Sequence, residues 1–414
     1  MILLGGCDSG GGRGEVVRFW GLGREGEVVR ELVTDFERSH PGITVVVQQI
    51  PWSAAHEQLL TAFVGGSTPD VAQVGNTWIP ELAALGAVAP LDAHVAASPV
   101  VHQSDHFEGI WDTNVVDGVL CGIPWYVDTR VVFYRSDLLA AIGVTAFPRT
   151  WSAWLQAMRR LAAGGNARYA ILLPTDDWTP PVILGLGRGA SLLRDGDRYG
   201  HFQEPAFAEA FSFYLRMFRE GLAPALANTQ LANMYQQMAE GQFAMHITGP
   251  WNLGEFRRRF PPQLAHAWAT APIPAPDGAP WPGASLAGGA SLVVFARSRH
   301  VGAAWRLVEY LSEPRTQLRF FELTGDLPAH RGAWDDPRLR GDPRVAAFWE
   351  QLQHARPTPK VPEWEQIATR VWRAAESAIR GQASPEQALA SLDRDVDRIL
   401  AKRRFLLERR KARP

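Results

Sequence analysis

The N-terminal part of the chain alternates between strand-like and helix-like segments. The run Glu15–Trp20 (EVVRFW) has the composition of a strand, and apolar residues then recur at helical spacing over Glu27–His40. The alternation continues with a β-branched run at Ile43–Ile50, a helix at Ala54–Val64, a short strand at Asp70–Val74 and a helix at Ile79–Leu85. This order predicts an α/β lobe with a largely parallel sheet, because parallel strands need a crossover helix between them.

The chain has 414 residues, which is too long for one ordinary hydrophobic core. After Ile123–Thr129 (IPWYVDT) the pattern changes, and we expect the first crossover between two lobes there. A second α/β lobe is expected to follow, and a connector rich in Pro and Gly, residues 272–284, then leads back toward the first lobe. The second lobe is predicted from strands at Arg130–Tyr134, Tyr169–Leu173 and Phe243–Thr248 and helices at Trp151–Ala162, Ala206–Glu220 and Leu231–Glu240.

The composition excludes several classes of function. Lys plus Arg (42) and Asp plus Glu (43) nearly cancel, so nothing points to nucleic acid as a partner. Two cysteines cannot build a disulfide framework or a Cys-rich metal site, and His56-Glu57 lacks a second His at helical spacing. We therefore predict no metal and no cofactor. No apolar run approaches the roughly twenty residues that span a membrane.

The N-terminus resembles a bacterial lipoprotein processing site. Leu4-Gly5-Gly6 precedes Cys7, which would then carry the lipid and anchor the protein to a membrane. Only Ile2, Leu3 and Leu4 stand where a signal peptide has an apolar core of roughly 7–15 residues, so an unstructured tail with an incidental Cys stays open. Residues 1–14 are expected to lie outside the fold in either case.

Residues 21–26 (GLGREG) match the G-x-G-x-x-G pattern of dinucleotide-binding loops. That site also needs an acidic residue about 20 positions later, where this chain has Gln48-Gln49-Ile50. Glu25 inside the motif would repel a pyrophosphate. The pattern instead predicts a turn at the carboxyl edge of the sheet, from which Arg24 and Glu25 bind hydroxyl groups.

Two adjacent carboxylates, Asp176-Asp177, stand beside Trp178, a combination that glycosidases also use around a sugar ring. Neighbours on an extended segment point to opposite faces, which weakens an acid/base pair. No G-x-S-x-G nucleophile elbow occurs. We predict that the protein is not an enzyme, with a carbohydrate-active enzyme using Asp128, Asp176 or Asp177 as the alternative.

Four blocks, in this order, resemble family 1 of the extracellular (periplasmic) solute-binding proteins of carbohydrate ABC importers, including maltose- and trehalose-binding proteins. The likeness runs from about Glu15 to about Leu400. The blocks are Pro69-Asp70-Val71 with Gly75-Asn76-Thr77-Trp78, Gly122–Asp128 leading into Phe133–Leu139, Met238–Met245 running into Ile247-Thr248-Gly249-Pro250-Trp251, and Gly325–Arg331.

The resemblance implies a two-lobe periplasmic-binding-protein fold of the class II type, each lobe a mostly parallel sheet flanked by helices. We expect residues 15–127 plus 286–326 in lobe 1 and residues 128–285 plus 327–414 in lobe 2, with three crossings as a hinge. The implied function is capture of a small saccharide and delivery to an ABC permease with its ATPase, outside the cytoplasm and as a monomer. Val74 stands where maltose binders tend to have an aromatic residue, which favours a disaccharide such as trehalose or maltose over a long maltodextrin.

The same resemblance assigns ligand-binding residues. Trp251 is the expected stacking residue, Asp128 with Tyr126 the polar contact near the hinge, and Arg331 a clamp for hydroxyls. The further candidates are Glu25, Asn76, Trp78, Trp125, Trp178, Gly289 and Trp364. The tryptophans at helical positions are assigned to core packing instead: Trp151, Trp154, Trp305 and Trp372.

One other ligand class stays open. A glycerol phosphate diester would need a cluster of cations in the cleft, and Arg24, Arg130 and Arg331 leave that alternative available.

Overall fold

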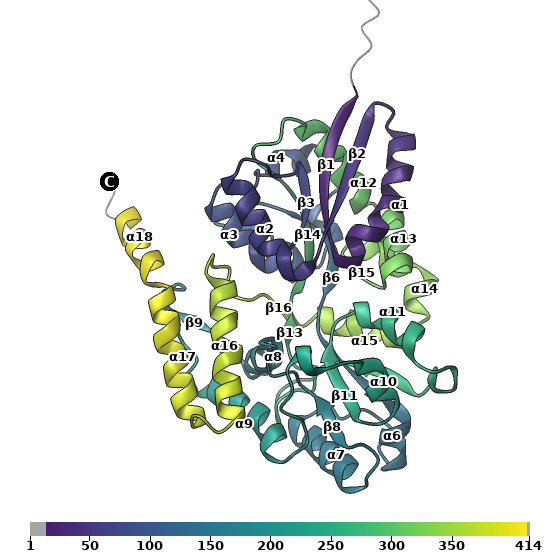
Figure 1. Cartoon of the computed structure of the whole chain (residues 1–414), viewed down its shortest axis with the longest axis vertical. Helices are drawn as coiled ribbons and strands as arrows, with labels where there is room; N and C mark the ends of the chain where they lie inside the picture. The colour runs from purple at the N-terminus through teal and green to yellow at the C-terminus, as the bar shows by residue number, and fades with distance from the viewer. Residues whose placement is uncertain (1–13, 412–414) are drawn as a thin grey trace, which may run out of the picture.

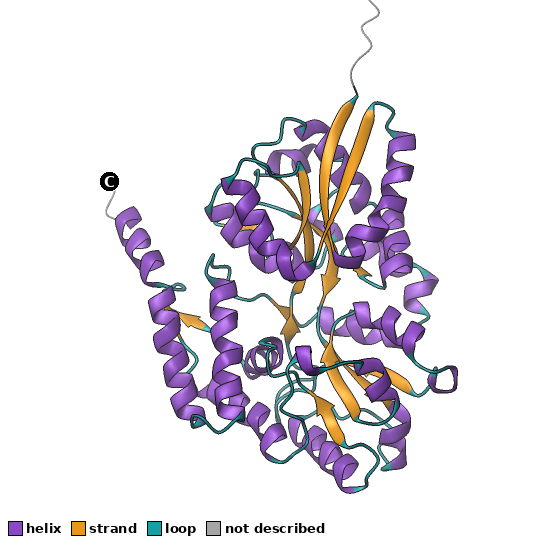
Figure 2. Ribbon diagram, viewed as in Figure 1, coloured by secondary structure: helices purple, strands orange, loops and turns teal. Residues whose placement is uncertain are grey.

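Two sheets, one above the other in Figure 1, organise the protein, whose computed structural model describes residues 14–411. Helices flank both sheets, as Figure 2 shows, so the two-lobe α/β fold is present. Cys7 lies outside the described residues. Within residues 14–411, none of the helices combines the length and apolar character needed to cross a bilayer.

Lobe 1 is built on a six-stranded sheet with the order β15-β6-β14-β3-β1-β2. β1 runs parallel to β2 and β3, while β14 runs antiparallel to both β3 and β6, so four of the six strands share one direction. The strands are β1 (Glu15–Leu22), β2 (Ile43–Ile50), β3 (Val71–Gly75), β6 (Ile123–Asp128), β14 (Gly288–Val294) and β15 (Leu327–Pro328). The helices around them are α1 (Gly23–Ser39), α2 (Trp52–Val64), α3 (Ile79–Ala84), α4 (Asp92–Ala97), α5 (Glu108–Asp112), α12 (Val301–Ser312) and α13 (Pro314–Thr324), with the short η1 (Asn76–Trp78).

Lobe 2 is built on a four-stranded sheet with the order β12-β7-β11-β8. β8 and β11 are parallel, and β7 runs antiparallel to both of its neighbours. The strands are β7 (Val131–Arg135), β8 (Tyr169–Leu172), β11 (Phe243–Thr248) and β12 (Trp268–Ala271). The helices are α6 (Ser136–Ala141), α7 (Trp151–Ala163), α8 (Thr179–Arg188), α9 (Pro205–Arg219), α10 (Met234–Ala239), α11 (Trp251–Arg259), α14 (Pro337–Arg340), α15 (Pro343–Leu352), α16 (Trp364–Ile379), α17 (Pro385–Ile399) and α18 (Ala401–Lys411).

The chain passes between the sheets three times: after β6, before β14 and after β15. The first two crossings are tied together, because Ser285 Oγ accepts a hydrogen bond from Arg130 N (3.0 Å) and donates one to Arg130 O (2.8 Å). A short parallel pair, β13 (Ser285–Leu286) with β16 (Ala355–Arg356), braces the second crossing. The lobe boundaries given above stay our proposal; β6 and β15 extend the lobe 1 sheet to Asp128 and Pro328.

Each lobe has its own buried core, and a third cluster joins them. That cluster contains Phe107 and Val127 from the lobe 1 side and Phe133, Trp268 and Phe348 from the lobe 2 side. Apolar side chains that pack across the crossings fix where the two lobes meet.

The tryptophans assigned to the core behave as expected at three of four positions. Trp151, Trp154 and Trp305 are buried. The prediction of core packing is wrong for Trp372, which is half-buried on α16. It lies beside Arg373, whose guanidinium carbon is 5.4 Å from a Trp372 ring centroid. The apolar face of α16 that packs into lobe 2 is instead made by Trp364, Ile367, Ala368, Val371, Ala375 and Ala378.

Candidate functional site

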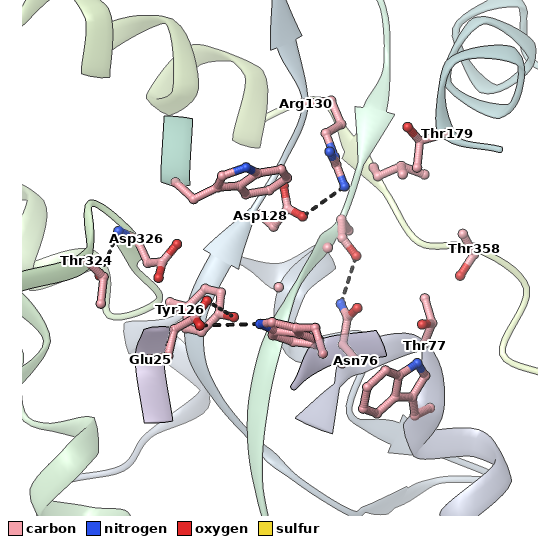
Figure 3. Close-up of a pocket in the computed structure, with 18 of the residues that line it drawn as sticks. Glu25, Asn76, Thr77, Tyr126, Asp128, Arg130, Thr179, Thr324, Asp326 and Thr358 are labelled. Carbon is pink, nitrogen blue, oxygen red and sulfur yellow. Dashed lines mark hydrogen bonds and ion pairs between the residues drawn. The ribbon is translucent and has the colours of Figure 1, made fainter. Parts of the chain in front are cut away.

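A cavity of about 500 Å³ lies between the lobes, and side chains from both lobes line it (Figure 3). It opens where β1, β3 and β6 end and where α8 and α11 begin, which is the edge at which open α/β sheets hold ligands. The lining residues are Arg24, Glu25, Trp52, Gly75, Asn76, Thr77, Trp78, Tyr126, Asp128, Arg130, Trp178, Thr179, Trp251, Glu255, Leu286, Ala287, Gly288, Gly289, Thr324, Asp326 and Thr358.

Glu25 reaches the cavity from the first turn of α1. The turn from β1 into α1 is tight because Gly21 and Gly26 touch: a Cβ on Gly21 would lie 2.5 Å from Gly26 Cα. The glycines of the G-x-G-x-x-G pattern thus let a strand and a helix pack closely. The Glu25 carboxylate accepts hydrogen bonds from Trp52 Nε1 and from the Tyr126 hydroxyl, both at 3.3 Å. Burial raises the pKa of this carboxyl group.

A buried glutamine orients the tyrosine. Gln73 is fully buried; its Oε1 accepts from Leu22 N at the end of β1 (2.7 Å). Its Nε2 donates to the Tyr126 hydroxyl (3.1 Å), which leaves the hydroxyl proton directed at Glu25. Burial, followed by the charge of Glu25, raises the pKa of Tyr126 well above its ordinary value, so the hydroxyl stays a donor. Gln73 therefore holds the Tyr126 hydroxyl of β6 where it can donate to Glu25.

Asp128 and Arg130 flank the first crossing and meet Trp251 of lobe 2. Arg130 Nη2 lies 3.3 Å from Asp128 Oδ2, and the guanidinium carbon lies 4.6 Å from the Trp251 ring centroid. Burial raises the pKa of Asp128, and Arg130 opposes that rise. A cation over an aromatic face is attracted by the ring quadrupole, so this trio is held in one arrangement.

Asp326 is the most buried charged group of the cavity. Its side chain sits on the short link between α13 and β15, and the residue is 2% exposed. Asp326 Oδ1 has no hydrogen-bond partner within residues 14–411. Burial, and then the charge of Glu25, raise the pKa of Asp326 well above its ordinary range. Figure 3 places Asp326 and Glu25 at the same end of the cavity.

Tryptophan side chains line much of the rest of the cavity. Trp52 and Trp78 of lobe 1 meet edge to face, with ring centroids 5.7 Å apart. Trp178 of lobe 2 packs against Trp364 with an interplanar angle of 81° and centroids 5.3 Å apart. Indole faces give a large apolar surface with a polar edge, which suits ligands that are apolar on one face and polar around the rim.

Eight of the eleven predicted ligand-binding residues line this cavity: Glu25, Asn76, Trp78, Tyr126, Asp128, Trp178, Trp251 and Gly289. Asn76 is held by a hydrogen bond from its Nδ2 to Ala287 O at 3.0 Å. The remaining three lie elsewhere and are corrected here.

Trp125 is 0% exposed and stacks on Phe320 in the lobe 1 core, because successive side chains of a strand point to opposite faces and Tyr126 takes the cavity side. Trp364 is 1% exposed and supports Trp178 from behind. Arg331 lies in η5 (Arg331–Asp335), which turns away from the cavity after β15. Its guanidinium sits 5.7 Å from the Phe107 ring and lines a separate pocket with Trp334 and Trp349.

Trp52 and Asp326 are cavity residues that the sequence prediction missed. Asp326 stands in the block Gly325–Arg331, in which the family resemblance points to Arg331 instead; the αL conformation of Gly325 (φ 91°) ends α13 just before Asp326. Trp52 directly follows Pro51 and begins α2, the same place in its element that Trp251 has after Pro250. A Pro-Trp pair at the start of a helix was therefore the sequence signal that could have identified Trp52 as a cavity residue.

The adjacent carboxylates considered for catalysis hold a loop. Asp176 Oδ1 accepts from Asn228 N and Nδ2 (2.8 and 2.9 Å), and Asp177 Oδ1 accepts from Thr179 N (2.8 Å) at the start of α8. Neither residue lines the cavity. This pair therefore offers no acid and base on a bound ligand.

Comparison with known proteins places the chain in a family. A solved structure of the sugar-binding protein MalE from the phytopathogen Xanthomonas citri is 46% identical, covers 95% of this chain and 99% of its own, and superposes with a TM-score of 0.90. The galactooligosaccharide-binding protein of Bacillus subtilis (strain 168) is 25% identical over 91% of this chain and 87% of its own length. The diacetylchitobiose binding protein DasA of Streptomyces coelicolor is 25% identical over 81% of this chain and 77% of its own length. The family model for bacterial extracellular solute-binding proteins matches residues 20–318, and the chain belongs to that family.

Proposed function

We propose that the cavity binds a small saccharide and that the protein is the substrate-binding component of an ABC importer. The observation that carries the proposal is the gathering of four tryptophans and four buried or half-buried acids around one cavity between the lobes. A pyranose has an apolar C–H face, which packs on an indole ring, and a rim of hydroxyls, which carboxylates and amides bind. The tryptophans are Trp52, Trp78, Trp178 and Trp251, and the acids are Glu25, Asp128, Glu255 and Asp326.

The relatives support a saccharide over other solutes. The three proteins compared above are named for binding sugar, galactooligosaccharide and diacetylchitobiose, and none is named as an enzyme. The cavity volume of about 500 Å³ lies in the lower half of the range typical of small-molecule sites, about 300–1,000 Å³. A disaccharide such as trehalose or maltose suits that volume better than a long maltodextrin.

Delivery follows from the two-lobe architecture. A ligand held between lobes stabilises the closed form by its differential affinity for that form, and the closed form then docks on a membrane permease with its ATPase. We place the protein outside the cytoplasm, as a monomer, with Cys7 as the site of a lipid anchor.

The electrostatics of the cavity weigh against the phosphate diester. Arg331 is absent from the lining, Arg130 is already paired with Asp128, and Arg24, which lines the cavity, donates to Leu323 O. Glu25 and Asp326, which also line the cavity, would repel an anion when ionised. We therefore propose a ligand without negative charge.

Thermal unfolding against a panel of saccharides tests the proposal. Trehalose, maltose, sucrose and glucose are each added at millimolar concentration, and thin-layer chromatography follows the same samples. A ligand that binds only the folded state raises the free energy of unfolding by mass action, by about 2.7 kcal/mol at 100 times its Kd, and therefore raises the unfolding midpoint. A shift with one sugar that stays intact supports transport; cleavage of the sugar would replace binding by catalysis, and no shift would remove saccharides as the ligand class.

A further inference from the structure

Acidic and basic groups do not balance at the end of the cavity where Glu25 and Asp326 lie. Of the four carboxylates that line the cavity, Asp128 is paired with Arg130, and Glu255 is ion-paired with Arg258 and Arg259 of its own helix. The other two, Glu25 and Asp326, form no ion pair within 4 Å in the part of the chain that the structure describes.

Arg24 also lines the cavity, but within residues 14–411 it forms no ion pair with either acid within 4 Å. Arg24 is exposed, and its Nη2 donates to Leu323 O (3.3 Å). The charge of Arg24 still lowers the pKa of Glu25 and of Asp326, but in both cases burial is the larger effect and the pKa is raised. Two carboxyl groups that repel each other at a buried site share a proton or need a cation between them.

Two carboxylate oxygens beside the cavity have no hydrogen-bond donor within residues 14–411. Asp326 is 2% exposed, and its Oδ1 has no partner within residues 14–411, as is also true of Asp128 Oδ1 nearby. Glu25 accepts two hydrogen bonds of 3.3 Å, which are long for bonds to a charged acceptor, and so retains capacity for another donor. In Figure 3 Glu25 and Asp326 lie at the same end of the cavity, and Asp128 lies beside Arg130.

We propose that the Glu25–Asp326 end of the cavity binds an ammonium group carried by the ligand, so that amino sugars bind more tightly than the corresponding neutral sugars. An ammonium group brings three donors and one positive charge, whereas a hydroxyl brings one donor and no charge. At a buried carboxylate pair both differences favour the amine. This inference rests on the proposed saccharide function and names the chemical class of its preferred ligand.

A matched series of ligands tests it. Isothermal titration at pH 7 measures the Kd of trehalose and maltose, of their analogues with one hydroxyl at C2, C4 or C6 replaced by an amine, and of the N-acetylated form of each amine. At least one amine is expected to bind ten-fold or more tightly than its parent sugar. Its N-acetyl derivative, which keeps the nitrogen and loses the charge, is expected to lose that gain.

Protein variants assign the effect to the two carboxyl groups. Asp326→Asn and Glu25→Gln keep the shape of the side chain and replace one ionisable carboxyl group each, and each is expected to bring the amine-to-hydroxyl ratio of Kd values to within two- to three-fold of one. Asp176→Asn removes a carboxylate outside the cavity and is expected to keep the ratio. Thermal unfolding of each variant confirms that it is folded; if one fails, the other carries the test.

The outcomes separate the two proposals. If neutral sugars bind and no amine binds more tightly than its parent, the ammonium inference is wrong while the saccharide function stands. The inference is equally wrong if the preference for the amine survives in both charge-removing variants. If neither neutral nor amino sugars bind, the proposed function itself falls, and the inference falls with it.

Discussion

The guanidinium group of Arg130 lies over the indole ring of Trp251, with its central carbon 4.6 Å from the ring centroid. Arg130 also pairs with Asp128 at 3.3 Å, and its backbone is bonded to Ser285 at the second crossing. One residue therefore connects the chain crossings, an acid of the cavity and the expected stacking ring. We expect a ligand that displaces Trp251 to act on the crossings through Arg130.

Removing the ring of Trp251 tests its role in binding. Trp251→Ala is expected to weaken saccharide binding by about 1.5–3 kcal/mol, or roughly 10- to 150-fold in Kd, because a sugar face loses the apolar surface it covers. Isothermal titration measures the change. Trp372→Ala is the control, since Trp372 is half-buried on α16 outside the cavity; an equal loss in both variants would refute a specific role for Trp251.

Breaking the Asp128–Arg130 pair tests how the hinge side of the cavity is held. Arg130→Met is expected to lower the free energy of unfolding by about 1–3 kcal/mol, because it leaves the buried Asp128 carboxylate without its cation. Adding Asp128→Asn to that variant is expected to recover part of the loss, and chemical unfolding of the four proteins gives the coupling energy. Additive losses in the double variant would show that the pair contributes nothing.

Gly249 offers a way to move Trp251 without removing it. A Cβ at this position would overlap the Trp251 ring and lie 2.6 Å from Asp128 Oδ1. Gly249→Ala is therefore expected to displace the indole and raise the saccharide Kd by about ten-fold or more, since 1.4 kcal/mol of lost contact suffices for that. Titration checks it. An unchanged Kd would mean that the ring position seen here is not the one that binds.

His106 predicts how stability depends on pH. The residue is 3% exposed, its Nδ1 hydrogen-bonds His102 O at 2.9 Å, and burial is the main cause that lowers its pKa from 6.5 to about 4. His330, at 5.9 Å between ring centroids, lowers this pKa further, while Asp105 opposes the shift.

Between pH 6.5 and 4 the unfolded chain binds a proton at this residue and the folded chain does not. The contribution of neutral His106 is thus fully present above about pH 6.5 and is lost as the pH falls toward 4, by up to about 3 kcal/mol. Urea unfolding at pH 7.5 and 4.5 measures it. His106→Asn is expected to flatten the dependence, whereas the same change at the exposed His266 is expected to leave it; a variant as pH-dependent as the parent would contradict the assignment.

Most elements of the fold were predictable because their signals are local. The strands Ile43–Ile50 and Phe243–Thr248 agree with the sequence prediction at both ends, since a run of apolar and β-branched residues has clear limits. Ser384 caps α17 with Pro385 at the first position, and Gln387 completes a capping box. The start of α1 at Gly23, four residues before the predicted Glu27, was hidden because two of its first four residues are glycines.

The site was predictable only where a motif marks the cavity side of an element. Tyr126 and Asp128 alternate along β6 and face the cavity, whereas Trp125 between them faces the core; period-two alternation contained that distinction. The place of Arg331 could not be found in this way, because the turn of η5 away from the cavity depends on its packing against α13 and α14. Glu25 and Asp326 are far apart in sequence, so their position at the same end of the cavity could be seen only in the tertiary structure.

A crystal structure of the protein grown with the saccharide that stabilises it most tests the central claim directly. The account predicts one sugar between the lobes, with a ring packed on Trp251 and its hydroxyl or amino groups within hydrogen-bond distance of Glu25, Asp128 or Asp326. A sugar bound outside this cavity, with the cavity left to solvent, would contradict the account.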